Sequence, residues 1–278
     1  MTATGELELE GLPQRLFSCT PSRLTTWVDC PRHYRMKYLD RPRPTPGPPW
    51  AHNSLGASVH NALAGWWRLP PNARTAEAAA QLLDAGWLAE GFRDEQQSAG
   101  WRDRAREMVR RYAARLDPRR EPVGVERTLG ARTRRLALSG RVDRLDDRDG
   151  ELVVVDYKTG RRPPTLDDAR GSAALALYAV AAGRTLRRPC HLVELHHVPT
   201  GEVVTWRHTD ESLARQVRRA EDVADEIVAA GVDPTADTFP ARPGAQCGWC
   251  TYRAHCAEGQ RAAPAREPWA ALDEPAAS

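Results

Sequence analysis

Hydrophobic residues recur along the first third of the chain at the three-to-four-residue spacing of amphipathic helices. The stretch 53–67 places leucine, valine and tryptophan side chains on one such face, and Asn53 stands at its start as a candidate cap. A second helix over 22–39 is predicted to break at Cys30-Pro31, because proline removes a helical hydrogen bond. The same spacing predicts further helices over 75–92, 97–116, 166–182 and 210–230.

From Pro122 onward the apolar positions alternate with polar ones or form short runs, which is the pattern of β-strands. The turn sequence Pro199-Thr200-Gly201 separates two of these stretches and predicts a hairpin. The order of helices, then strands with an inserted helix, indicates an α/β core with helical additions. Strands are expected over 123–129, 135–147, 151–159, 191–198 and 202–208.

The organisation of the chain follows from these patterns. The N-terminal segment 1–17 begins with an acidic stretch, 1–14, that lacks an apolar core, so we expect no secretory signal there. A helical region is expected at 18–120, a core at 121–232 and a cysteine-rich cap at 233–261. The tail 262–278 is rich in alanine and proline and is predicted to be disordered. Since no apolar run is long enough to span a bilayer, we expect a cytoplasmic protein without membrane contact.

Composition narrows the function classes. With 278 residues, 41% of them hydrophobic and 28% charged, the chain is typical of a soluble protein with a sizeable core. A net charge of +3 hardly favours nucleic acid by itself, and the absence of a Walker A motif excludes an ATP-driven motor. Only two of the 40 basic residues are lysines, Lys37 and Lys158. In such an arginine-rich chain, Lys158 indicates a need for an ammonium group, because a partly buried lysine can release its proton.

Two carboxylates and this lysine form the first candidate site. An apolar run ends in Asp156 and Lys158, which share one face of a predicted strand. A hairpin would place Asp143, on the preceding strand, beside Asp156, and paired carboxylates favour a cation between them. Oxygen ligands suit Mg²⁺ or Mn²⁺, and Lys158 could orient or activate a water molecule. The set indicates metal-assisted phosphodiester hydrolysis, while a plain surface ion pair is the alternative for the Asp-x-Lys motif alone.

Four segments carry a resemblance to a known family. GRVDRLD at 140–146 and VVVDYKTG at 153–160 resemble the catalytic signature of the PD-(D/E)XK nuclease superfamily, in its RecB-like branch. TPSRLTTWVDCPRHYRMKYL at 20–39 resembles the N-terminal helix of that branch, and LGASVHNAL at 55–63 resembles a helix that carries a histidine. The resemblance covers about residues 18–258. It implies a restriction-endonuclease-like α/β core with a mixed central sheet, an N-terminal helical elaboration and a C-terminal iron–sulfur cap.

The resemblance also implies an activity and roles for individual residues. Asp143 and Asp156 would hold Mg²⁺ or Mn²⁺ together with the backbone carbonyl of Tyr157, and Lys158 would be the catalytic lysine. The implied reaction is cleavage of DNA, with exonuclease action on single strands or ends, in DNA repair or processing. A helicase or repair protein is a conceivable partner, because relatives are fused to a helicase.

Two further residues are candidates for this site. His60 would approach the metal ion from the helical side, although by its sequence context alone it is more typical of a half-buried structural histidine. Glu126 lies on the first predicted strand and is the weaker candidate. An ordinary exposed strand carboxylate explains Glu126 equally well.

The expected DNA contacts are Tyr178, Arg161 and Arg162. The family has Gln-x-x-x-Tyr on the helix after the lysine strand, and Tyr178 matches the tyrosine. Ala174 stands where the glutamine is expected, so the amide contact with substrate is lost. This departure favours the alternative function, a DNA-binding or scaffold protein that retains the fold without catalysis.

The cysteines form the second candidate site. Cys247, Cys250 and Cys256 have the spacing C-x₂-C-x₅-C, and three thiolates need a fourth ligand to enclose one metal centre. Cys19 and Cys190 fit no such spacing and are predicted to be free structural cysteines.

The missing ligand is suggested by the resemblance. RecB-like nucleases with this triplet, including the AddB subunit and CRISPR-associated adaptation nucleases, pair it with a distant N-terminal Cys-Pro, which here is Cys30-Pro31. They bind a [4Fe–4S] cluster, so the resemblance implies a cluster on Cys30 and the triplet. A zinc site with four cysteines is the alternative.

Overall fold

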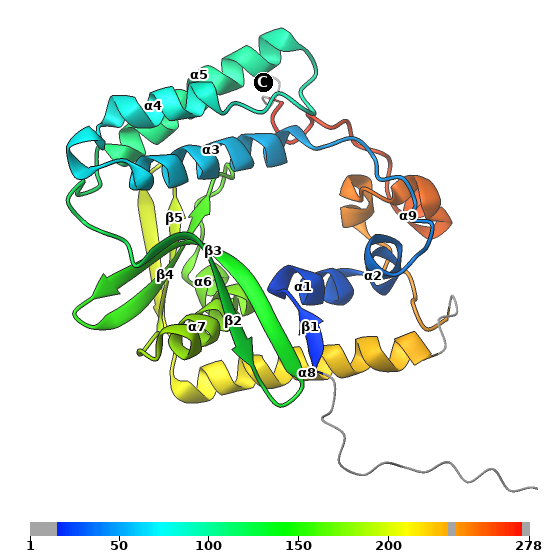
Figure 1. The fold of residues 1–278 in the computed structure, drawn as a ribbon. Helices are drawn as coiled ribbons and strands as arrows, with labels where there is room; N and C mark the ends of the chain where they lie inside the picture. The colour runs from blue at the N-terminus through cyan, green and yellow to red at the C-terminus, as the bar shows by residue number, and fades with distance from the viewer. Residues whose placement is uncertain (1–15, 233–236, 274–278) are drawn as a thin grey trace, which may run out of the picture.

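A computed structural model describes residues 16–232 and 237–273. At its centre lies one mixed sheet with the strand order β1-β3-β4-β5-β6, in which β2 pairs with β3 (Figure 1). The pairs β1–β3 and β4–β5 are parallel and the others are antiparallel. The strands are β1 (Phe17–Cys19), β2 (Gly124–Arg132), β3 (Leu136–Arg148), β4 (Glu151–Lys158), β5 (Leu192–His197) and β6 (Glu202–Arg207). The α/β class and the mixed sheet predicted from the sequence are confirmed.

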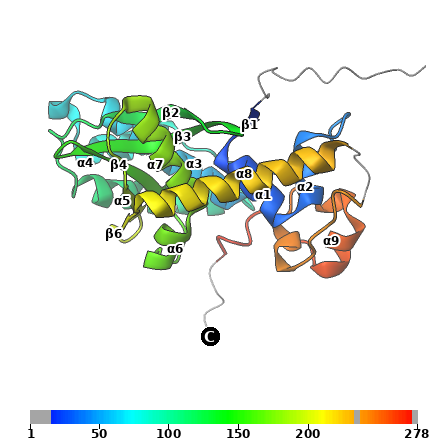
Figure 2. The same cartoon turned by 90° about the horizontal axis from the view of Figure 1, so that it is seen from below.

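Helices cover both faces of this sheet. Helices α3, α4 and α5 form one layer, whereas α1, α7 and α8 lie against the opposite face (Figures 1 and 2). The helices are α1 (Pro21–Asp29), α2 (Pro31–Tyr38), α3 (Ala51–Arg68), α4 (Ala76–Ala85), α5 (Glu95–Ala113), α6 (Leu166–Gly171), α7 (Ala173–Leu186), α8 (Asp210–Val232) and α9 (Ala257–Ala262). No helix within the described ranges has the length and apolar character that a membrane span requires.

Burial on both faces explains the continuous apolar run of β4. Leu152 and Val154 pack with the α1–α7–α8 layer, and Val153 and Val155 pack with the α3–α4–α5 layer. Such strands carry no polar alternation, because neither face meets water. Asp156 and Lys158 follow this buried run, so they lie at the end of β4, where the core ends.

The hairpin between β3 and β4 is confirmed. Its two loop residues, Asp149 and Gly150, have φ of 53° and 91°, as a tight hairpin turn between twisted strands requires. The strand register pairs Arg144 with Val155, so the next residues along the two strands are Asp143 and Asp156.

Several helix predictions need correction. Trp50, not Asn53, caps α3, and its side chain makes no capping bond. The helix predicted to reach residue 92 ends at Gly86, which has no β-carbon to favour helix continuation. The helix predicted over 166–182 is two helices, because the Ser172 side chain accepts a hydrogen bond from the Leu175 amide and starts a new helix. The short strand β1 was not predicted.

The prediction of a disordered tail from residue 262 is wrong for 262–273. Leu272 is 5% exposed and packs in the α3–α4–α5 layer, and its carbonyl accepts a hydrogen bond from the Trp101 indole at 3.1 Å. Burial of apolar groups outweighs the alanine- and proline-rich composition here. The remainder of that prediction, 274–278, lies outside the described residues, as do 1–15 and 233–236.

Candidate metal centre

A break in the β2–β3 ladder creates the candidate site. Glu126 has a φ of 49°, a left-handed conformation that is unusual for a non-glycine residue in a strand. The strand register is the same before and after the break, which puts Glu126 opposite Asp143. Across the break the facing of β2 reverses, since Val125 packs with the α3–α4–α5 layer and Leu129 with the opposite layer. Backbone strain of this kind is concentrated at functional sites.

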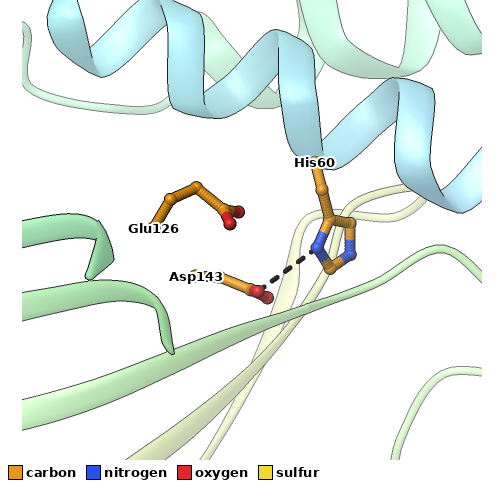
Figure 3. Close-up of side chains that lie close together, drawn as sticks. All are labelled: His60, Glu126 and Asp143. Carbon is orange, nitrogen blue, oxygen red and sulfur yellow. Dashed lines mark ion pairs between the residues drawn. The ribbon is translucent and has the colours of Figure 1, made fainter. Parts of the chain in front are cut away.

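A third side chain meets these two carboxylates from above. His60 projects from α3 toward Asp143, with 3.3 Å between Nδ1 and a carboxylate oxygen (Figure 3). One ligand atom each from His60, Glu126 and Asp143 can be chosen so that all lie within 4.8 Å of one another, the only such group in the described parts of the chain. One imidazole and two carboxylates suit a divalent cation. Glu126, the weaker sequence candidate, thus lies with His60 and Asp143 in this candidate group.

The backbone of Tyr157 holds two of these groups. Its amide donates to Asp143 Oδ2 at 2.8 Å, and its carbonyl accepts a hydrogen bond from His60 Nε2 at 3.1 Å. With a proton on Nε2, the other ring nitrogen of His60 faces the carboxylate of Asp143. Burial alone would lower the pKa of His60, but the hydrogen bond and charge of Asp143 raise it on balance. The raised pKa favours a second proton, on Nδ1, which His60 would donate to the Asp143 carboxylate. A cation between Nδ1 and Asp143 would take the place of this Nδ1 proton.

Asp156 and Lys158 complete the end of β4. Their side chains form an ion pair with 2.6 Å between Nζ and Oδ2. Burial raises the pKa of Asp156, the charge of Lys158 opposes that rise, and the charge of Asp143 adds to it. Asp156 thus stands beside Asp143 as predicted, and its carboxylate pairs with Lys158 and not with the His60 group.

A cleft of about 660 Å³ opens beside this strand end. His60, Asp156, Lys158 and Arg161 line it, and Leu272 from the C-terminal segment forms part of the wall. Through this cleft a substrate could reach Lys158 and the Asp156 carboxylate that pairs with it.

Of the three predicted DNA contacts, Arg161 lines the cleft, whereas Arg162 and Tyr178 do not. Arg161 lines it and donates a hydrogen bond to the Asp273 carbonyl, whereas Arg162 is exposed and pairs with Asp168 at 3.2 Å. Tyr178 lies on α7 across β3. Burial, followed by the charges of Asp156 and Asp143, raises its pKa.

A buried polar network behind the site was missed by sequence reasoning. The Tyr157 hydroxyl accepts hydrogen bonds from the Trp67 indole at 3.1 Å and from the Arg144 guanidinium at 3.0 Å. Arg144 and Asp146 form an ion pair at 2.9 Å, with side chains 3% and 1% exposed. The Tyr157 backbone forms hydrogen bonds with His60 and Asp143. By holding the Tyr157 side chain, the network therefore also holds these two residues in position. Its only sequence signal is an arginine and an aspartate two apart on a strand, facing the same way.

Removing one member of this network is expected to be costly. Arg144→Met leaves the Asp146 carboxylate buried without a counter-charge, and we expect a loss of about 3–5 kcal/mol in the free energy of unfolding. Denaturant titration measures this loss. Arg188→Met, which removes a partly exposed partner of the exposed Asp147, is the control and should change stability little. An Arg144→Met protein as stable as the parent would show that the pair contributes nothing to folding.

The four cysteines of the second candidate site line one cavity of about 420 Å³. The lining residues come from α2 and from the segment that ends in α9, two parts of the chain that lie close together in Figure 1. Cys30 Sγ accepts a backbone hydrogen bond from Arg242 at 3.5 Å, and Cys256 Sγ accepts one from Gly259 at 3.4 Å. No three of the thiols lie within 4.8 Å of one another in the described chain. The other two lining cysteines are Cys247 and Cys250.

Cys19 and Cys190 lie elsewhere in the core. Burial raises the pKa of their thiols, to about 11 for Cys19 and about 12 for Cys190. Neither lines the cavity of the other four.

Comparison with known proteins places this geometry in context. The sequence model of a family described as the PD-(D/E)XK nuclease superfamily matches residues 18–257. That span contains the candidate metal centre, the end of β4 and all four cysteines of the second cavity. No curated protein matches the chain.

Proposed function

Because the chain belongs to the PD-(D/E)XK nuclease superfamily, we propose that it is a Mg²⁺- or Mn²⁺-dependent deoxyribonuclease that acts on single strands or DNA ends. The observation that carries the proposal is the meeting of Asp143, Asp156, Lys158 and His60 where β3, β4 and α3 converge. Carboxylates that repel one another, with an amine at the rim of an open cleft, suit a hydrolytic metal site better than a structural ion pair.

Each residue would have a distinct task. Asp143, Asp156 and His60, with the Tyr157 carbonyl, would hold the divalent cation, and Glu126 would complete its ligand set from β2. The cation would offset phosphate charge and acidify a water molecule. Lys158 is about half exposed at the cleft, where its ammonium group can donate to a phosphate oxygen or orient a water molecule. The Asp156 carboxylate keeps that ammonium group in place until the cation binds.

We also propose that Cys30 and the C-terminal triplet hold a [4Fe–4S] cluster, as in the RecB-like branch. A tetrahedral zinc ion draws its sulfur ligands to about 3.8 Å from one another, given Zn–S bonds of about 2.3 Å. The cavity of about 420 Å³ that all four cysteines line has room for a centre larger than one zinc ion. The backbone hydrogen bonds to Cys30 and Cys256 are of the kind that supports cluster sulfurs.

Incubation with end-labelled DNA tests the catalytic proposal. We expect single-stranded DNA, or duplex ends, to be shortened with Mg²⁺ or Mn²⁺ and to stay intact with EDTA. A labelled RNA strand separates deoxyribonuclease from ribonuclease action. DNA that is bound but never cleaved with either metal would favour the non-catalytic scaffold instead.

The salt dependence of DNA binding is a further prediction. Arg161 at the cleft and neighbouring arginines would contact phosphates, and each contact releases a counterion. With EDTA present, affinity for a single-stranded oligonucleotide should fall by about tenfold or more between about 50 and 200 mM salt. Fluorescence anisotropy measures this. A flat response would show that arginine–phosphate contacts do not provide the binding energy.

DNA repair or processing in the cytoplasm is the setting we propose, with a helicase or repair protein as the candidate partner. An open cleft at a strand end is compatible with a partner that delivers unwound DNA. Co-purification with a DNA-translocating protein tests this part separately.

A further inference from the structure

Three aromatic side chains connect the cysteine cavity with the cleft beside the candidate metal centre. Trp249, in the loop between Cys247 and Cys250, lines the cavity of the four thiols. The centre of its ring lies 5.1 Å from that of Trp50 and 5.8 Å from that of His52, both in edge-to-face contact. Trp50 precedes α3 as its cap residue, and His52, in the first turn of α3, lines the cleft. A side chain of one site therefore packs directly against a side chain of the other.

The C-terminal segment that follows α9 connects the same two sites through its backbone. The Arg266 guanidinium lies 4.9 Å from the centre of the Trp249 ring, and the Arg266 amide donates to the Gly248 carbonyl at 3.2 Å. Two residues later, the Pro268 carbonyl accepts a hydrogen bond from the Ala51 amide at 3.1 Å. Figure 1 shows this segment, in red, between α9 and the start of α3. The first residue of α3 is thus held by the chain that leaves the cysteine cavity.

The end of this segment forms part of the cleft wall. Leu272 lines the cleft together with Trp101, and the Trp101 indole donates to the Leu272 carbonyl at 3.1 Å. The next carbonyl, of Asp273, accepts a hydrogen bond from Arg161, which also lines the cleft. One continuous segment is therefore anchored on Trp249 at one end and shapes the cleft at the other.

These contacts end well before the metal-binding group. His60 lies eight residues beyond His52 on α3, which is about 12 Å along the helix axis. Its Nε2 donates to the Tyr157 carbonyl and its Nδ1 faces Asp143, so β3 and β4 hold it independently of the cysteine site. A shift at the start of α3 would therefore change the cleft wall and leave the metal-binding group in place.

The lining of the cleft fits an unpaired nucleic-acid strand. Lys158 and Arg161 supply positive charge, and Trp101, Met108 and Leu272 supply apolar surface. Single-stranded DNA presents charged phosphates and apolar base faces, whereas duplex DNA hides the base faces in its stack. A change in the shape of this wall would thus change the affinity for single strands.

We propose that Trp249 is a positioning residue for single-stranded DNA, an inference that rests on the proposed nuclease function. Its ring holds the start of α3 and, through Arg266, the C-terminal segment, so that the cleft keeps the shape that binds a strand. DNA binding then depends on the cysteine site, because two of the four thiols flank Trp249. Cys256→Ser should weaken DNA binding for this reason. Adding Trp249→Leu should weaken it no further, since residues that act through one contact are not additive.

Fluorescence anisotropy in EDTA tests binding apart from cleavage. Trp249→Leu should bind a single-stranded oligonucleotide about tenfold more weakly than the parent, which is the scale of losing two aromatic contacts. Trp249→Phe keeps a ring at this position and should stay within about twofold of the parent. The control is Trp206→Leu, because Trp206 is also half-buried but lines neither the cleft nor the cysteine cavity, and DNA binding by this variant should be unchanged.

Kinetics and hydrogen exchange separate positioning from general damage. In Mn²⁺-dependent cleavage, Trp249→Leu should raise KM about tenfold and leave kcat within about twofold, whereas a loss of folded enzyme would lower kcat alone. Exchange of the Ala51 amide, which is bonded to the Pro268 carbonyl, should be about tenfold faster than in the parent. The iron content of Trp249→Leu should equal that of the parent, since all four thiols are kept.

The outcomes distinguish this inference from the proposed function. A parent protein that neither binds nor cleaves DNA would contradict the proposed function, while exchange of the Ala51 amide would still show whether Trp249 holds the cleft wall. Four results would each overturn the inference: parental DNA affinity and Ala51 exchange in Trp249→Leu, a lowered kcat at unchanged KM, an equal loss of binding in Trp206→Leu, or loss of iron from Trp249→Leu.

Discussion

Asp143→Asn is expected to reduce metal-dependent DNA cleavage below about one thousandth of the parent rate, while DNA binding persists. The change is isosteric, so the side-chain oxygen of the variant can still accept from the Tyr157 amide and the fold should survive. What is lost is the negative charge that faces His60 and Glu126. A cation then has a weaker ligand set at the point where β2, β3 and α3 meet.

The other two members of the motif should give the same loss for different reasons. Asp156→Asn removes the negative charge of the second carboxylate. Lys158→Ala removes the ammonium group at the cleft and leaves both carboxylates unchanged. Time courses on end-labelled single-stranded DNA with Mg²⁺ or Mn²⁺ measure cleavage, and anisotropy in EDTA measures binding. Asp147→Asn, which changes an exposed carboxylate on β3, the strand of Asp143, is the matched control and should cleave like the parent.

If all three variants cleave as the parent does, the nuclease assignment of this site is wrong. If only Lys158→Ala retains activity, the metal centre stands but the amine is not needed for chemistry. Loss of DNA binding in Asp143→Asn would instead point to a damaged fold, which unfolding curves would reveal.

The site illustrates which features are local enough to be predicted from sequence. Asp143 and Asp156 could be placed side by side because a two-residue turn, Asp149-Gly150, fixes the register of the hairpin. His60 could be named only through family resemblance, since its own helix pattern does not say that α3 lies over the strand ends.

Glu126 shows the limit of local patterns. Its left-handed backbone has no sequence signal, because glutamate neither favours nor marks that conformation. The tertiary packing of β2 on two different layers imposes it. The Arg144–Asp146 pair was missed for the same reason, because elements distant in the sequence bury it. The C-terminal segment is likewise buried by distant elements, although its composition is typical of disorder.

Loss of iron and of brown colour is the expected result of both Cys30→Ser and Cys256→Ser. These residues lie at opposite ends of the chain, yet both line one cavity with Cys247 and Cys250. Only a shared centre would make their effects alike. Each variant should also become protease-sensitive near α1–α2 and near α9, because the cluster closes a loop of more than 200 residues and its loss frees both segments.

The controls come from the same chain. Cys19→Ser and Cys190→Ser should keep full iron content and parental protease resistance, since these thiols are buried away from the cavity. Iron analysis of anaerobically purified protein, with zinc measured in parallel, separates a [4Fe–4S] cluster from a zinc site. If Cys30→Ser keeps full iron while Cys256→Ser loses it, Cys30 is not a ligand. The fourth ligand would then be sought at His33, which lines the cavity, and not at His255, whose Nε2 is bound to the Thr45 carbonyl at 2.9 Å.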